Sequence, residues 1–152
     1  MVELTTPITG GCLCGAVRFQ ISAKPLAAHY CHCTMCQKQT GGPFGVFATV
    51  PSEGFSFTKD QPAAYESSPG SLRLFCGACG SPLGARAAED PKLIAIVVGC
   101  LDDPNLIKPE SHAFTSTQVS WCEMDDGLPR HAEGSPELRK LWAEMGGWDL
   151  PE

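Results

Sequence analysis

The sequence contains no block rich in lysine or arginine, and only 18% of its 152 residues are charged. Its formal net charge is −6. Nucleic acids and anionic membranes bind proteins through clustered basic side chains, so we expect neither as a partner. With 43% hydrophobic residues, the composition is nevertheless typical of a globular protein and not of a disordered one.

Long hydrophobic runs are absent as well. The longest apolar stretch, residues 93–100, is far shorter than the roughly 18 residues that a membrane helix needs. The first residues have neither the basic head nor the apolar body of a secretory signal, so we expect a cytoplasmic protein. The length is that of one ordinary domain, and we interpret residues 1–152 as a single domain.

Short apolar segments and frequent turn signals predict a mostly β fold. The chain has 16 glycines and 13 prolines, and turn signals recur every eight to twelve residues from residue 25 to residue 104. Between the turn signals, apolar residues alternate or form short continuous runs, as they do in β-strands. The expected strands are residues 14–21, 27–31, 45–50, 55–57, 72–74 and 93–99.

One helix is expected near the C-terminus, at about residues 136–145. Ser135 is a suitable N-cap, Pro136 suits the first turn, and the glycines at 146–147 would end the helix. Its apolar residues recur at helical spacing, which predicts a face that packs against the sheet. These residues are Leu138, Leu141, Trp142 and Met145.

Nine cysteines are the unusual feature, and seven of them fall into three tight groups. An odd number of cysteines without a secretory signal argues against a disulfide framework, and the clustering argues against scattered buried thiols. Metal ligation therefore explains the pattern best. Zinc is favoured over an iron–sulfur cluster, whose usual cysteine spacings differ. The groups are Cys12 and Cys14, then Cys31, Cys33 and Cys36, then Cys76 and Cys79, with Cys100 and Cys122 alone.

The first and last groups together offer four thiolates. Cys12 and Cys14 share one face of an extended segment, and Cys76 and Cys79 flank a tight turn that Gly80 can complete with a positive φ. Four thiolates satisfy a tetrahedral zinc completely, which is typical of a structural site. Such a site would connect the first strand to the middle of the chain.

The remaining group offers three thiolates within six residues. We expect Thr34 to cap a short helical turn at residues 35–40 that ends at Gly41 and brings Cys36 back toward Cys31 and Cys33. Three protein ligands leave one tetrahedral position open, as in catalytic zinc sites. The site would instead be structural if another side chain of the protein filled that position. The candidates are Cys100, Cys122, His32 and His112.

These motifs resemble the glutathione-dependent formaldehyde-activating enzyme family over roughly residues 10–130. The resemblance rests on GCLCGAVRF at 11–19, CHCTMCQK at 31–38 with Gly41, and FCGACGS at 75–81. The segments HAF at 112–114 and WCEMDDGLP at 121–129 resemble its C-terminal signature. The resemblance implies Mss4-like folded antiparallel sheets around two zinc ions per chain. It also implies that Cys12, Cys14, Cys76 and Cys79 hold a structural zinc, and that Cys31, Cys33 and Cys36 hold a catalytic one.

The activity that the resemblance implies is that of a carbon–sulfur lyase, which condenses glutathione with formaldehyde to S-hydroxymethylglutathione. The expected partners are therefore a small thiol and a small aldehyde. Two alternatives remain, namely a non-catalytic binding module with two structural zinc sites, and an enzyme acting on a different thiol adduct. A fourth protein ligand and the lack of an adjoining pocket would favour the binding module.

Assigning roles to the other polar residues is harder from sequence. His32 and His112 are candidates for moving the proton of the reaction, whereas His29 and His131 are interpreted as ordinary core or surface residues. Three cations could contact glutathione carboxylates, but each is interpreted as solvated. They are Arg18, Lys38 and Arg73. Cys100 is interpreted as a small buried hydrophobic residue.

Overall fold

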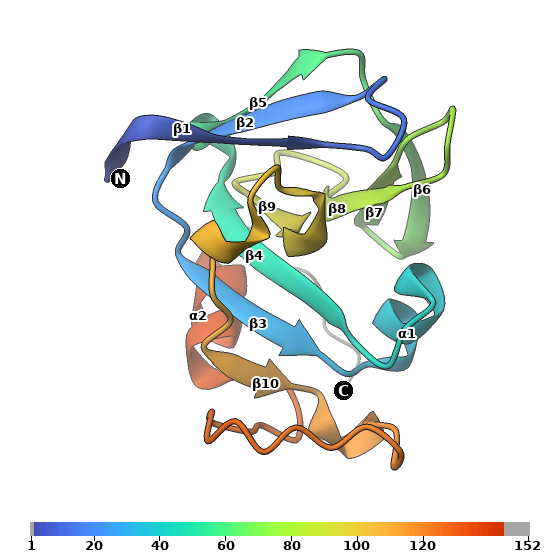
Figure 1. The fold of residues 1–152 in the computed structure, drawn as a ribbon. Coiled ribbons are helices and arrows are strands. Elements are labelled where there is room, and N and C mark those ends of the chain that lie inside the picture. The colour runs from blue at the N-terminus through green and yellow to red at the C-terminus, as the bar shows by residue number, and fades with distance from the viewer. Residues whose placement is uncertain (1, 145–152) are drawn as a thin grey trace.

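The computed structural model describes residues 2–144, in which ten strands form two sheets (Figure 1). The smaller sheet has the strand order β1-β2-β5, and the larger has the order β10-β3-β4-β9-β8-β7-β6. The strands are β1 (Glu3–Gly11), β2 (Arg18–Ala23), β3 (Ala27–Cys31), β4 (Gly45–Pro51), β5 (Phe55–Lys59), β6 (Ala63–Ser68), β7 (Ser71–Phe75), β8 (Pro82–Ala87), β9 (Leu93–Val97) and β10 (Ser111–Ala113). The helices are α1 (Thr34–Thr40) and α2 (Pro136–Glu144), and short 3₁₀ turns are η1 (Ser52–Gly54), η2 (Val98–Cys100), η3 (Pro104–Leu106) and η4 (Thr115–Thr117).

The prediction of a mostly β fold with a short C-terminal helix is confirmed. All paired strands are antiparallel except β10, which runs parallel to β3 at the edge of the larger sheet. The expected antiparallel sheets are therefore present, with this one parallel pair in addition. The reason is the connection: the chain leaves β9 through η2 and η3 and reaches the edge by a crossover, and not by a hairpin, which would force an antiparallel pair.

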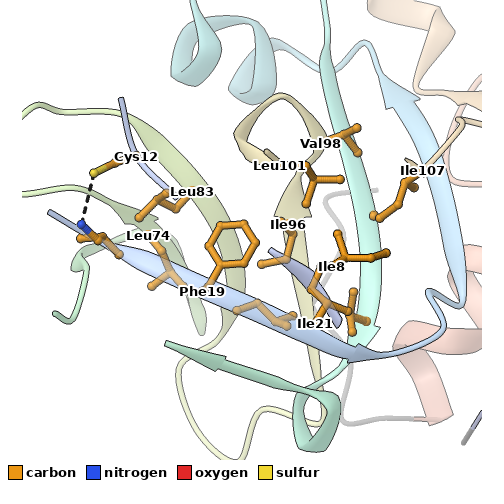
Figure 2. Packing of buried hydrophobic residues seen from close by; sticks show 14 of the residues in the cluster. Ile8, Cys12, Phe19, Ile21, Leu74, Leu83, Ile96, Val98, Leu101 and Ile107 are labelled. Carbon is orange, nitrogen blue, oxygen red and sulfur yellow. Dashed lines mark hydrogen bonds between the residues drawn. The ribbon is translucent and has the colours of Figure 1, made fainter. Parts of the chain in front are cut away.

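The main core lies between the two sheets. Phe19 and Ile21 of β2 face Leu74 of β7 and Ile96 of β9, and all four side chains are buried (Figure 2). Because side chains alternate along a strand, only every second residue of the larger sheet takes part in this layer. The smaller sheet therefore covers one face of the larger sheet and leaves the other face for different contacts.

The second face of the larger sheet carries a different set of side chains. Strand β4 shows the division, since Ala48 and Val50 lie in the core between the sheets while Phe47 packs with cysteines on the opposite face. Strand β9 divides in the same way, with Ile94 and Ile96 on the core side and Ala95 on the other. This second face is the floor of the candidate site described below.

The six predicted strand segments all fall on observed strands, with shifts at their ends. Residues 93–99 were expected to form one strand, but β9 ends at Val97 because η2 turns the chain there. Strands β1, β6, β8 and β10 were not predicted. None of the helices in residues 2–144 is long and apolar enough to cross a membrane.

Helix α2 begins as expected. The Ser135 hydroxyl accepts a hydrogen bond from the Leu138 backbone N–H at 3.2 Å, which is the geometry of an N-cap. Leu138 and Trp142 are buried against Leu93 and Ala113, and Leu141 packs at the edge of the same cluster. The predicted packing face is therefore confirmed up to Trp142. Met145 and the glycines at 146–147 lie outside the described residues.

We expect Leu138→Ala to lower the free energy of unfolding by about 2–5 kcal/mol, because it removes a fully buried side chain from the contact between α2 and the sheet. Urea denaturation followed by circular dichroism measures this change. The exposed neighbour Glu137 provides the control, since Glu137→Ala should cost less than about 1 kcal/mol. Equal effects of the two substitutions would contradict the packing of α2.

Candidate functional site

The two outer cysteine groups meet where the two sheets approach each other. Cys12 and Cys14 lie in the turn between β1 and β2, and Cys76 and Cys79 lie in the turn between β7 and β8. Their four sulfur atoms lie within 4.8 Å of one another. The Sγ atoms of Cys12 and Cys14 are 3.6 Å apart, and those of Cys14 and Cys76 are 3.8 Å apart. Sulfurs bound tetrahedrally to zinc at about 2.3 Å lie just under 4 Å apart, so the arrangement fits zinc.

Backbone hydrogen bonds hold this quartet of cysteines in place. The Val17 N–H donates to Cys12 Sγ at 3.2 Å, and the Leu13 N–H donates to the Ser81 hydroxyl at 3.0 Å, which joins the two turns. Gly80 has a φ of 78°, as expected for the residue that completes the second turn. The pKa of Cys79 is lowered to about 5, chiefly because the Ser81 hydroxyl donates a hydrogen bond to its sulfur.

The second cysteine group, here called the trio, lies where β3 passes into α1. Cys31 ends β3, Cys33 is the N-cap of α1, and Cys36 lies in the first turn of the helix. The three sulfur atoms lie within 4.8 Å of one another. The helix covers Thr34–Thr40, one residue more than expected, and Gly41 ends it in the left-handed conformation as predicted.

The prediction that Thr34 caps α1 is wrong. Cys33 occupies the N-cap, and its sulfur accepts a hydrogen bond from the Cys36 N–H at 3.3 Å. A thiolate can accept this bond as a serine hydroxyl would, so the capping contact also fixes the spacing of two members of the trio. The fold of the helix and the geometry of the candidate site therefore depend on the same atom.

The three thiols of the trio do not ionise independently. The pKa of Cys33 is lowered to about 2, chiefly because Cys31 and then Cys36 donate hydrogen bonds to its sulfur. The same bond to Cys33 raises the pKa of Cys31. The bond with Cys31 lowers the pKa of Cys36, but the bond to Cys33 and burial outweigh it and raise the value to about 11. At neutral pH the metal-free trio thus carries one negative charge on three sulfurs.

The described residues place no fourth cysteine, histidine, aspartate or glutamate with the trio. Each of the candidates named from sequence lies elsewhere. The Cys100 thiol donates to the Pro82 carbonyl oxygen at 2.9 Å and is only half-buried, and Cys122 belongs to neither group. The ring of His32 shares a hydrogen bond with the ring of His112, as described below.

The trio opens into a cavity of about 580 Å³ on the second face of the larger sheet. All three cysteines line this cavity. Phe47, Phe114 and Trp142 contribute apolar wall, and Arg73 contributes a buried cation. A cavity of this size, mostly apolar with a few polar groups, is typical of a site for a small molecule.

His32 and His112 form a buried hydrogen-bonded chain that the sequence did not reveal. The Nε2 atom of His32 lies 2.8 Å from Nδ1 of His112, and Nε2 of His112 lies 2.9 Å from Oδ2 of Asp126. Burial, then the neighbouring His112, lowers the pKa of His32 to about 4. Neither histidine lines the cavity, so their expected role in moving a proton at the trio gains no support from the structure.

His29 is buried, which agrees with its interpretation as a core or surface residue, and it also lines the cavity, where burial lowers its pKa to about 4. One other expectation needs correction. Arg73 was interpreted as solvated, but it is only 8% exposed and lines the same cavity. The other two candidate cations do not reach the site: Arg18 pairs with Asp102, and Lys38 is exposed on α1.

Comparison with known proteins gives consistent results. A family model described as "Glutathione-dependent formaldehyde-activating enzyme" matches residues 7–117. A Halomonas elongata protein named "Putative glutathione-dependent formaldehyde-activating enzyme" is 30% identical over 130 residues, which cover 78% of this chain and 81% of that protein. A crystal structure of a Rhodobacter sphaeroides protein is similar with a TM-score of 0.54 and 19% identity, over 81% of this chain and 98% of that one. The last likeness concerns the fold alone.

We expect zinc binding to the trio to release two protons near pH 7, because Cys31 and Cys36 are protonated in the metal-free state and must ionise to bind. Zinc affinity should therefore rise with pH, by up to about 100-fold per pH unit. Zinc titration in weak buffer with a pH indicator measures the protons. The Cys33→Ser variant lacks one ligand of the trio and keeps the quartet intact. The protons that it releases on zinc binding therefore measure the contribution of the quartet. A zinc affinity that stays the same between pH 6 and 8, or binding that releases no proton, would contradict this charge state.

Proposed function

This chain belongs to the glutathione-dependent formaldehyde-activating enzyme family, and we propose that it is a zinc-dependent carbon–sulfur lyase. In this proposal it joins a thiol such as glutathione to a small aldehyde and cleaves the resulting adduct, as an S-(hydroxymethyl)glutathione synthase would. One observation carries the proposal: three cysteines without a fourth partner among residues 2–144 open into a cavity large enough for a thiol and its adduct.

The two cysteine groups have different proposed roles. Cys12, Cys14, Cys76 and Cys79 would hold a structural zinc, since four thiolates leave no position for a substrate. Cys31, Cys33 and Cys36 would hold the catalytic zinc. When bound to the trio, zinc would supply a Lewis acid that lowers the pKa of an incoming thiol into the neutral range. The proposal therefore expects two zinc ions per chain, in a cytoplasmic protein whose thiols stay reduced.

The reaction itself needs little from the protein beyond binding and orientation. The thiol sulfur attacks the carbonyl carbon, the carbon–sulfur bond forms, and the thiol proton ends on the oxygen as a hydroxyl. The cavity walls hold the two reactants together and limit the access of water. Among the described residues that line this cavity, His29 is the one histidine, and burial keeps its ring neutral at physiological pH. The reverse direction cleaves the same bond.

The structure supports an enzyme over a non-catalytic binding module. The module would be favoured by a fourth protein ligand at the trio and by the lack of an adjoining pocket. The described residues show neither feature, because the trio has three members and lines a cavity. Glutathione as the thiol and formaldehyde as the aldehyde are likewise proposed.

We expect the zinc-loaded protein to accelerate the exchange between free glutathione, formaldehyde and their adduct, which two-dimensional exchange NMR measures directly. Cys33→Ser should remove this acceleration, because the trio then has two thiolates instead of three. The variant should still fold and should keep one zinc per chain. Cys122→Ser, a cysteine outside both groups, should behave as the unmodified protein. A Cys33→Ser variant with full activity would overturn the proposal.

A further inference from the structure

Arg73 is a buried cation without a carboxylate partner. Its Nη1 donates to Gln39 Oε1 at 3.1 Å and to Cys36 Sγ at 3.8 Å, and its Nε donates to Ser67 Oγ at 3.2 Å. Within residues 2–144, none of the ion pairs includes this guanidinium, and Nη2 makes no hydrogen bond. Neutral oxygens satisfy hydrogen bonds but not charge, and a buried charge normally lies beside an opposite one.

The sheet beside Arg73 is open because its neighbours are small. Strand register places Ala85 of β8 opposite Arg73, Ala95 of β9 opposite Ala85, and Thr49 of β4 opposite Ala95. All four residues line the cavity. Neighbouring strands lie about 4.8 Å apart, so this row spans roughly 14 Å from Thr49 to Arg73. Two alanines in its middle leave space where larger side chains would close the sheet face.

The trio borders the same space. The contact of 3.8 Å between Arg73 Nη1 and Cys36 Sγ fixes the distance between the cation and the sulfurs. A thiol held at the trio would therefore have its nearby substituents within reach of the guanidinium. Of the cavity-lining residues, Glu133 is the one carboxylate, and it is exposed and accepts a hydrogen bond from Ser116. The opposite charge nearest to Arg73 is that of the trio sulfurs. No carboxylate of the described residues forms an ion pair with Arg73, so the cavity side of the guanidinium can accept one from a ligand.

We propose that Arg73 binds a carboxylate of the thiol substrate, so that the site selects thiols that carry a carboxylate. The inference rests on the proposed function in one respect, namely that the trio binds the thiol. A guanidinium and a carboxylate form a charge-assisted hydrogen bond whose strength rises in a buried site. Selectivity then comes from Arg73, and not from Arg18 or Lys38, which do not line the cavity.

The test compares two thiols that differ in one group. Protein loaded with Co²⁺ is titrated with 3-mercaptopropionate and with 3-mercaptopropionamide, and the change in the sulfur-to-cobalt absorption bands gives each Kd. We expect the carboxylate to bind at least about tenfold more tightly. Arg73→Gln should reduce this ratio to about one while the Kd of the amide stays unchanged, and Arg73→Lys should give an intermediate ratio.

Arg86→Gln is the matched control, because Arg86 follows Ala85 on β8, does not line the cavity and donates to the Ala87 carbonyl oxygen. It should leave the ratio unchanged. If Arg73 only supports Cys36, Arg73→Gln will weaken cobalt binding and both thiols equally, and the proposal falls. Equal affinities for the two thiols in the unmodified protein also overturn it, whether or not the Arg73 variants fold.

The same experiments separate this inference from the proposed function. Selective binding of the carboxylate without acceleration of the glutathione–formaldehyde exchange would overturn the proposed reaction and leave the role of Arg73 intact. Acceleration of the exchange together with equal affinity for the acid and the amide would leave the proposed reaction intact and overturn the role of Arg73.

Discussion

The convergence of four cysteine sulfurs from two hairpin turns is the contact on which the rest of the structure depends. Cys12 and Cys14 belong to the turn of the smaller sheet, and Cys76 and Cys79 to a turn of the larger one. Four thiolates this close together would repel one another unless a cation bound them, so a bound metal ion would add to the hydrogen bond between Leu13 and Ser81 that joins the two turns. The packing of the apolar core and a metal ion bound by these cysteines would thus stabilise the same relative position of the two sheets.

That position decides which face of the larger sheet is free for function. The smaller sheet covers the face with Leu74 and Ile96, and alternation along the strands turns Arg73 and Ala95 to the opposite face. The trio at the end of β3 borders this second face. The group of four cysteines therefore joins turns of the two sheets, while the group of three lies beside a cavity on the free face of the larger sheet.

Much of this arrangement could be predicted from local spacing, and the rest depends on contacts between distant residues. Cysteine spacing predicted both groups, and Ser135 predicted the start of α2, because each signal lies within a few residues. The bond between His32 and His112 joins residues 80 positions apart, which no local pattern reveals. Arg73 was misjudged for a related reason. Its position between Leu72 and Leu74 indicated the second face of the sheet, but only the tertiary structure shows that the Arg73 side chain is buried on this face, at the wall of a cavity.

The charge of the molecule constrains how such a site can recognise a ligand. A net charge of −6 repels an anionic thiol at long range, so electrostatic steering does not speed its approach. A single cation that is only 8% exposed acts at short range, after the ligand has left water. Its contribution should therefore appear in the rate of ligand dissociation more than in the rate of association. Selection by Arg73 would thus follow entry into the cavity, where the carboxylate and the sulfur are held at two fixed points.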